Sequence, residues 1–290
     1  MGKRAGLGYQ TGMSTNHTPS PATPSAGALI REWRTRRRMS QLDLALEAEI
    51  SQRHLSFVES GRSTPSRDMV LHLAEQLEVP LRERNRILLA AGYAPGFAER
   101  PLDDPSMGAV MAAVEKVLAG HEPNPALAVD RHWNLIKGNR AMAPFLDGIA
   151  NPALLESPVN VLRLSLHPEG LAPRIVNLIE WRDHLVERLH RLNQAVAEPA
   201  LYELEQELRA YPMPKRVRPA SAHDYSAIAV PLRLRFGETE LSFITTITVF
   251  GTPLDVTVSE IAVETFFPAD ERTAAIVRTM ADGGTAGRPS

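Results

Sequence analysis

The chain contains no cysteine at all. This absence excludes disulfide frameworks, thiolate metal ligands and cysteine nucleophiles, and it is compatible with a reducing cytoplasm. No apolar run approaches the ~20 residues that a membrane-spanning helix needs. Charged and turn-forming residues also stand at the N-terminus, where a signal peptide would have its apolar stretch. We therefore expect a cytoplasmic protein with no membrane partner.

A large excess of either charge is also absent, because 32 basic and 34 acidic residues leave a formal net charge of −2. This balance excludes a polycation that coats nucleic acid without selectivity. The charges are unevenly distributed: residues 1–26 carry +2, residues 27–92 hold 11 basic and 9 acidic residues, and residues 93–290 hold 19 and 25. The chain thus has a basic front and an acidic back.

The sequence lacks the short motifs of common enzyme classes. Its nine histidines include no His-x-x-x-His or His-Glu-x-x-His spacing, and His184 and His190 fall on different helix faces. There is no glycine-rich phosphate loop, no Gly-x-Ser-x-Gly elbow and no dinucleotide fingerprint. We expect a protein that is not an enzyme, with no metal, no catalytic residues and no cofactor.

Proline and glycine divide the chain into five parts. Residues 1–26, rich in Ser, Thr and Pro, read as a disordered arm, and residues 282–290 as a disordered tail. Residues 93–105 form a linker that contains four prolines or glycines among acidic residues. Between these segments we expect a helical domain at 27–92 and a mixed domain at 106–281, each with its own core.

Five short helices are predicted in residues 27–92. Ser40, with Asp43 three residues later, starts the second helix, whose buried face we take to be Leu42, Ala45 and Leu46. The others are expected to begin near Gly27, at Gln52 after the Ser51 cap, after Thr64-Pro65-Ser66, and at Leu81. In the third helix only Leu55 and Val58 point inward, which makes helices two and three a helix-turn-helix.

The exposed side chains of the third helix are suited to the major groove of DNA. Gln and Arg offer planar two-point contacts to base edges, and an amide at the start of the preceding helix can anchor a phosphate. The predicted DNA contacts are Gln41, Gln52, Arg53, His54, Ser56, Arg37, Arg38 and Arg62, with Arg36 as a further phosphate candidate. The alternative is a solvated face with arginines that serve solubility. Phe57 either touches a thymine methyl or packs under the neighbouring helix.

This helical segment resembles a known family. Ile30 to Val79, with MSQLDLALEAEISQRHLSFVESGRSTP at its centre, is similar to the XRE-type, lambda-repressor-like helix-turn-helix proteins. Glu49 departs from the pattern, which usually has Gly in the turn. The resemblance implies an Arg34–Glu59 pair between helices. Because one such domain contacts few bases, we expect a homodimer on a two-fold site in double-stranded operator DNA, with salt-sensitive binding.

Alternating apolar residues predict a sheet late in the chain. Ile228 to Phe236 and Leu241 to Val249 alternate as strands, with Pro231 indicating an edge strand. Leu254 to Val258 and Ile261 to Thr265 differ in parity, which indicates a break near Ser259-Glu260. With an earlier strand at Ala126 to Val129 and helices at Arg174 to Asn193 and Pro199 to Tyr211, these segments predict an α+β domain with an antiparallel sheet.

Residues 106–281 resemble the MmyB-like ligand-binding domain of a bacterial regulator family. The segments that carry the resemblance are NVLRLSLHPEG (160–170), NLIEW (177–181) and TVFGTPLDVTVSEIAVETFFPAD (248–270). The resemblance implies a PAS-like fold with an apolar pocket for fatty-acid-like molecules. In that frame, Arg163 and His167 would bind the polar end of a ligand, while Asn160, Asn177 and Trp181 would complete the pocket mouth.

Two functions are open at this point. The leading hypothesis is a dimeric DNA-binding transcription regulator whose DNA affinity responds to a small apolar ligand, and which is associated with the nucleoid when bound to DNA. The alternative is a DNA-bound scaffold whose rear domain dimerises or recruits a protein such as polymerase. The five ligand residues are also explained without a ligand, as a buried Arg on carbonyls, a helix-capping His and a core Trp. His132 and Trp133 have the same two interpretations.

Overall fold

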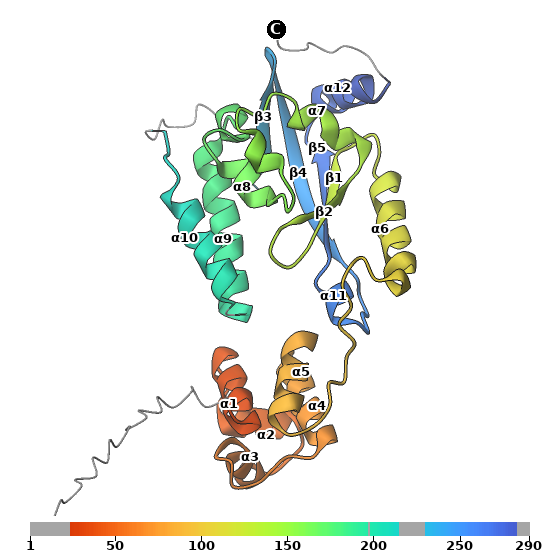
Figure 1. The fold of residues 1–290 in the computed structure, drawn as a ribbon. Helices are drawn as coiled ribbons and strands as arrows, with labels where there is room; N and C mark the ends of the chain where they lie inside the picture. The colour runs from red at the N-terminus through yellow and green to blue at the C-terminus, as the bar shows by residue number, and fades with distance from the viewer. Residues whose placement is uncertain (1–23, 197, 215–229, 283–290) are drawn as a thin grey trace, which may run out of the picture.

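The computed structural model describes residues 24–196, 198–214 and 230–282. The predicted arm and tail therefore lie almost wholly outside the described residues. Figure 1 shows a group of helices at one end of the molecule and, joined to them by a single connecting segment, a sheet with its own helices. The predicted boundaries at 27–92 and 106–281 follow this division, although where each domain ends is still a prediction.

Serine caps start most of the N-terminal helices. The side chains of Ser25, Ser40, Ser51 and Ser66 each accept a backbone N–H at the first turn, and Ser40 and Asp43 form the expected capping box. The helices are α1 (Ala26–Arg36), α2 (Gln41–Glu47), α3 (Gln52–Glu59), α4 (Arg67–Gln76) and α5 (Leu81–Ala90). Their starts agree with the predicted ones to within a residue.

The buried face of α2 differs from the predicted one. Leu44 and Ala45 lie in the core, whereas Leu42 and Leu46 are 51% and 68% exposed. Residues four apart share a helix face, so Leu42 and Leu46 both point away when Leu44 faces α3 and α4. The prediction was wrong because a seven-residue helix with leucines on two sides does not reveal its inner face.

The turn between α2 and α3 places a non-glycine residue in the left-handed region. Glu49 has a φ of 51°. Its N–H donates to Leu46 and that of Ile50 donates to Ala45, at 3.2 and 2.9 Å. These two bonds close the helix in the manner of a Schellman motif, which usually uses glycine at this position. The turn keeps its geometry although Glu stands where Gly is typical.

The second domain is built on an antiparallel sheet of five strands in the order β2-β1-β5-β4-β3. The strands are β1 (Ala126–Val129), β2 (Leu135–Gly138), β3 (Leu232–Phe236), β4 (Thr239–Val249) and β5 (Ala262–Pro268). The helices are α6 (Gly108–Gly120), α7 (Ala143–Leu146), α8 (Val161–Leu166), α9 (Leu178–Val196), α10 (Pro199–Ala210), α11 (Val256–Ser259) and α12 (Glu271–Ala281), with short 3-10 turns between them. This confirms the predicted α+β class.

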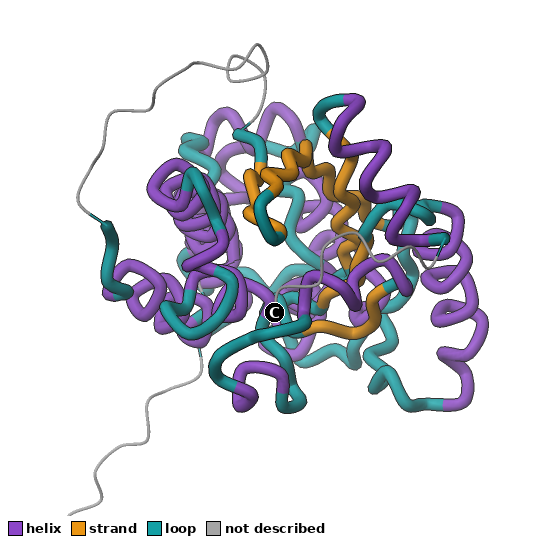
Figure 2. The backbone as a smooth tube through the Cα atoms, turned by 90° about the horizontal axis from the view of Figure 1, so that it is seen from above, coloured by secondary structure: helices purple, strands orange, loops and turns teal. Residues whose placement is uncertain are grey.

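Helices cover both faces of the sheet, as the view from above shows (Figure 2). Successive residues of β1 point to opposite sides. Ala126 and Ala128 meet Val114 and Leu118 of α6 in one core. Leu127 and Val129 belong to a larger core with α8, α9 and α10. The larger core lies between the sheet and these three helices.

Two strand predictions need correction. Leu254 to Val258 is not a strand, because Asp255 accepts the N–H groups of Thr257 and Val258 and starts the short helix α11. The predicted break near Ser259-Glu260 is where α11 ends. Of β4, only Leu241 to Phe243 is buried on both faces, and its far end is exposed. β3 begins at Leu232 on the sheet edge, as Pro231 indicated, while residues 228 and 229 lie outside the described part.

Candidate functional site

The recognition helix α3 presents a polar face to solvent. Gln52 and Arg53 are exposed at its first turn, and His54 and Ser56 are partly exposed. Leu55 and Val58 are the inward pair, as predicted, and the helix is held to α1 and α2 through them. This arrangement places the planar amide and guanidinium at the end of the helix that enters a major groove.

Phe57 packs between two arginines. The Cζ atoms of Arg53 and Arg62 lie 5.3 and 5.8 Å from the centre of its ring, within reach of a cation–π contact. The ring therefore supports two of the predicted DNA-contacting side chains. These contacts come from α3 itself and from the segment after it, so packing under the neighbouring helix and contact with a thymine methyl both stay predictions.

A buried carboxylate connects α1, α2 and α3. Glu59 accepts Arg34 Nε and Nη2 at 2.6 and 2.9 Å, and Gln41 Nε2 at 2.8 Å. The Arg34–Glu59 pair is thereby confirmed as a structural link, and this hydrogen-bonded carboxylate raises the pKa of Arg34. The amide of Gln41 is held at the start of α2 by the same link, and its contact to a DNA phosphate stays a prediction.

The arginines after α1 take different positions. Arg37 donates to the carbonyls of Leu77 and Glu78 at the end of α4, at 2.9 and 3.0 Å, so it has a structural role that sequence reasoning did not foresee. Arg36 borders a cavity between the two domains. Arg38 is exposed and remains, with Arg62, the better phosphate candidate.

The larger core of the second domain encloses an apolar cavity of about 430 Å³. Its wall is formed by β1 to β5 on one side and by α8, α9 and the segment around α7 on the other. Apolar side chains dominate the lining, among them Leu127, Leu162, Leu185, Leu232, Phe243 and Phe266. A cavity with this lining fits an apolar molecule of small or medium size.

Three of the five predicted ligand residues hold the structure together outside this cavity. Asn160 caps α8, and its Nδ2 donates to the His132 carbonyl at 2.8 Å. Arg163 pairs with Glu207 of α10 at the surface. His167 contacts the ring of Tyr211 at 5.2 Å. None of the three lines this cavity, and their contact with a ligand stays a prediction.

Asn177 and Trp181 differ in whether they line the apolar cavity. Asn177 is buried, donates to the Pro231 carbonyl at 2.8 Å and accepts the Arg233 N–H at 3.1 Å, so it fixes the start of β3 and does not line the cavity. Trp181 does line the cavity, and its Nε1 donates to Ser165 at 3.1 Å. Of the predicted ligand residues, only Trp181 borders the space available to a ligand.

Sequence reasoning missed the charged residues of the cavity. Arg188 of α9 and Glu264 of β5 both line it, with Nη1 of Arg188 donating to Oε1 of Glu264 at 3.1 Å. Their side chains are only 17% and 6% exposed. The available signals were an arginine on the apolar side of α9 and a glutamate within an apolar strand, and neither is distinctive among the chain's many charges.

Comparisons with known families account for both domains. The model of the MmyB-like transcription regulator ligand binding domain matches residues 110–280, and a helix-turn-helix model matches residues 30–84. The first match covers more than half of the chain. The chain belongs to the MmyB-like transcription regulator family. Both resemblances drawn from the sequence are thus confirmed, and no match is found among curated proteins.

This MmyB-like regulator therefore combines a DNA-binding and a ligand-binding module, as a ligand-responsive DNA-binding transcription regulator does. Both matched families are regulatory. Within the described ranges, no group of three or more histidine, aspartate or glutamate side chains could hold a metal ion. No helix among those residues is long and apolar enough to cross a membrane.

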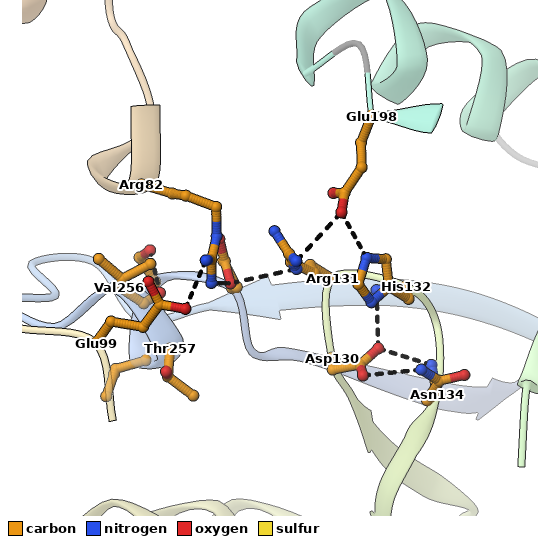
Figure 3. Close-up of polar contacts among 12 residues, drawn as sticks. Arg82, Glu99, Asp130, Arg131, His132, Asn134, Glu198, Val256 and Thr257 are labelled. Carbon is orange, nitrogen blue, oxygen red and sulfur yellow. Dashed lines mark hydrogen bonds and ion pairs between the residues drawn. The ribbon is translucent and has the colours of Figure 1, made fainter. Parts of the chain in front are cut away.

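Ion pairs join the MmyB-like domain to the helix-turn-helix. Arg82 of α5 donates Nε and Nη2 to the two carboxylate oxygens of Glu260, at 2.8 and 3.0 Å, and Nη1 to Glu99 of the linker. Glu260 and Glu198 are in turn contacted by Arg131, at 3.8 and 3.2 Å. Figure 3 labels Arg82 of α5, Glu99 of the linker, Arg131 of the β1–β2 loop and Glu198 at the start of α10. We call this group, with His132, the interdomain ion cluster.

The β1–β2 loop that carries Arg131 and His132 is internally fixed. Asp130 accepts the backbone N–H groups of His132 and Asn134, both at 2.8 Å, and the Asn134 amide at 3.0 Å (Figure 3). His132 Nε2 lies 2.8 Å from Glu198. The loop is therefore held together by its own hydrogen bonds, and a second cavity of about 770 Å³ lies between it, α1, α5 and α9.

Proposed function

We propose that this regulator binds a two-fold operator as a homodimer through α3, and that a fatty-acid-like molecule in the apolar cavity alters its DNA affinity. It would act in the cytoplasm, on the nucleoid when bound to DNA. The observation that carries the ligand part is the cavity of about 430 Å³ inside the larger core. Each methylene buried there would contribute about 0.8 kcal/mol, so an alkyl chain of moderate length suffices for useful affinity.

The dimer part is supported by the size of the reading surface. α3 is eight residues long, and its exposed polar side chains, Gln52 and Arg53, lie in the first turn. A single helix of this kind contacts only a few base pairs, whereas two copies related by a two-fold axis would read half-sites about one helical turn apart.

A route from the cavity to DNA follows from the contacts. Arg188, in the cavity wall, stacks on Trp133 with Cζ 4.2 Å from the ring centre. Trp133 belongs to the β1–β2 loop, whose Arg131 and His132 reach the interdomain ion cluster and hence Arg82 of α5. A ligand controls DNA binding only if it favours one arrangement of these parts over another. The loop is the element we expect it to shift.

DNA reading is tested by substitutions on α3. Operator fragments selected in vitro with the full-length protein are titrated by fluorescence anisotropy. Gln52→Ala and Arg53→Ala should each weaken binding by about 1–3 kcal/mol, because each removes a two-point base contact. Arg86→Ala removes a charge from the domain surface beside the interdomain cavity and should leave the affinity nearly unchanged. Parental affinity in both α3 variants would contradict the assignment of the recognition helix.

Ligand binding is tested by native mass spectrometry of the purified protein. A retained adduct of lipid size supports the sensor, and its release on denaturation shows that it is not covalent. An empty, well-folded protein that also fails to bind added alkyl amphiphiles would contradict the ligand part. That outcome would favour the DNA-bound scaffold, whose second domain dimerises or recruits a protein.

A further inference from the structure

The outer edge of β4 is free along the second half of the strand. β3 pairs with β4 only over residues 239–243, whereas β5 continues on the other side as far as Val249. Within the described ranges, no isolated bridge or turn hydrogen bond reaches the edge at residues 244–249. Ile247 and Val249 are accordingly 41% and 60% exposed, although both are large apolar residues. A free strand edge is a template for pairing with another strand.

The backbone groups on this edge point outward at every second residue. The carbonyl of Ser242 accepts the Ala269 N–H at 2.8 Å, so it faces the β5 side of the strand. Because a strand directs the N–H and C=O groups of successive residues to opposite sides, those of Thr245, Ile247 and Val249 face the open side. These residues thus present donors and acceptors with the spacing of an antiparallel ladder.

This edge has none of the features that usually prevent edge pairing. Residues 244–249 read ITTITV, with no charged residue, proline or glycine. Their register with β5 contains no bulge. Natural edges are usually protected by lysine, proline, a bulge or a covering loop. β-branched residues also favour pairing, since they pack well across neighbouring strands. An exposed edge of this composition is therefore suited to a partner strand.

We propose that the free edge of β4 pairs antiparallel with the same edge of a second copy of the chain, which joins the two sheets into one. The inference rests on the proposed homodimer and assigns its contact surface. Around a two-fold axis, Ile247 would meet Ile247 of the copy, while Thr245 and Val249 would meet each other. The start of β3 at one end and the bend after Val249 at the other bound the edge and limit the register.

Self-pairing fits this edge because of its charge, its symmetry and its place in the fold. Two identical edges repel one another when they carry charges, and this one is neutral over its whole length. An antiparallel pair has a two-fold axis, which is the symmetry that the operator-binding dimer needs. The free half of β4 runs past β3 toward the N-terminal helices (Figure 1), and Ile247 borders the cavity next to α1 and α5. The axis would thus pass close to the DNA-binding domains.

A charge at the centre of the edge tests the pairing. Ile247→Lys places two lysines opposite each other and should raise the dimer Kd of the full-length protein roughly a hundred-fold, measured by sedimentation velocity with and without operator DNA. Ile247→Glu should do the same. An equimolar mixture of the two variants should recover the parental Kd to within roughly ten-fold, because opposite charges then face each other. Val117→Lys, on α6 and 44% exposed, is the matched control and should dimerise as the parent does.

Hydrogen exchange locates the contact in the parent protein. As the protein concentration rises and the dimer forms, peptides that contain Ile247 and Val249 should exchange more slowly. Leu241 and Phe243 already pair with β3 and should not change. Protection of the edge at every concentration, in a protein that stays monomeric, would show that another part of the same chain covers it and would overturn the pairing.

The outcomes separate the β4 contact from the function on which it rests. A dimer whose Kd is unchanged in Ile247→Lys and Ile247→Glu would overturn the β4 contact and leave the homodimer standing, with its interface elsewhere. Loss of the dimer in both variants without recovery in their mixture would also overturn the contact, since the two charges then do not face each other. If the parent protein is a monomer both free and on operator DNA, the homodimer fails and the contact fails with it.

Discussion

Glu49 shows how much a single residue can depart from its family pattern while the local structure is kept. A side chain at φ 51° is strained by about 1–2 kcal/mol, because Cβ approaches the following carbonyl oxygen. Glycine removes this strain but adds flexibility to the unfolded chain at a cost of about 0.5–1 kcal/mol. The helix-turn-helix thus tolerates Glu because the two turn hydrogen bonds hold the conformation.

We expect Glu49→Gly to raise the free energy of unfolding by about 0.5–1 kcal/mol, which is the difference between these two effects. Urea denaturation of the full-length protein, followed by circular dichroism, measures the change. Glu47→Gly, within the last turn of α2, should lower the stability by about 1 kcal/mol. Destabilisation of similar size by both changes would show that Glu49 is not strained.

His184 gives the stability a dependence on pH. Burial lowers the pKa of His184, and the nearby charges of Arg188 and Arg191 lower it further. Its ring also stacks on Trp181 at 5.5 Å. The folded protein therefore favours the neutral ring, while the unfolded chain takes up a proton near the ordinary pKa of 6.5. Its contribution is fully present above the ordinary pKa and is lost as the pH falls from there through the lowered pKa of the folded state.

We expect the parent protein to lose more stability than His184→Gln when the pH is lowered from about 7.5 to about 5.5. Thermal unfolding at several pH values, with the same buffers for both proteins, measures the difference. Identical acid sensitivity throughout would contradict the assignment to His184.

At the scale of elements, the sequence predicted helices better than strands. A serine cap is a local signal, because its oxygen and the N–H it accepts lie within three residues. The segment from Leu254 to Val258 alternates like a strand, yet Asp255 starts a helix there once it is placed against Ala98 and the linker. A short alternating run does not reveal which partner its backbone will find.

Asn177 illustrates an element that depends on a distant residue. Its side-chain amide donates to the Pro231 carbonyl and accepts the Arg233 N–H at the start of β3. These two residues are 54 and 56 positions away from Asn177 in the sequence. We expect Asn177→Ala to destabilise the protein by about 2–4 kcal/mol, because two buried backbone groups lose their partners. Urea denaturation measures the loss. Gln194→Ala, on the exposed side of α9, should change the stability by less than about 0.5 kcal/mol. Equal effects would show that the bonds to β3 are dispensable.

At the scale of the whole molecule, Arg82 connects the DNA-binding domain to the ligand-binding domain. Hydrogen bonds to Glu260 and Glu99 raise its pKa, so the guanidinium is charged throughout the accessible pH range. Its partners come from the linker and from α11, which are 17 and 178 residues away in sequence. The pairs are partly solvated, so their effect on stability is small, of about 1 kcal/mol or less.

We expect Arg82→Gln to loosen the arrangement of the domains with little effect on their individual stability. Small-angle scattering should show a larger radius of gyration, and the α11 amides should exchange hydrogen faster. Arg86→Gln, whose pair with Glu83 lies within one helix, serves as the control. If a ligand still changes DNA affinity in Arg82→Gln as in the parent, the interdomain ion cluster does not transmit the signal.

The sequence by itself determined the two domains, the capped helices and the exposed polar face of α3. These follow from contacts within a few residues or from a regular repeat of apolar side chains, which a linear pattern records. The tertiary structure alone decided which residues border the cavity. In the folded chain, Asn160 and Asn177 donate hydrogen bonds to backbone carbonyls of distant segments. Arg163 pairs with Glu207. Arg188 lies beside Glu264 and Trp133. These contacts join strands and helices that are far apart in the chain, so no linear pattern of the sequence records them.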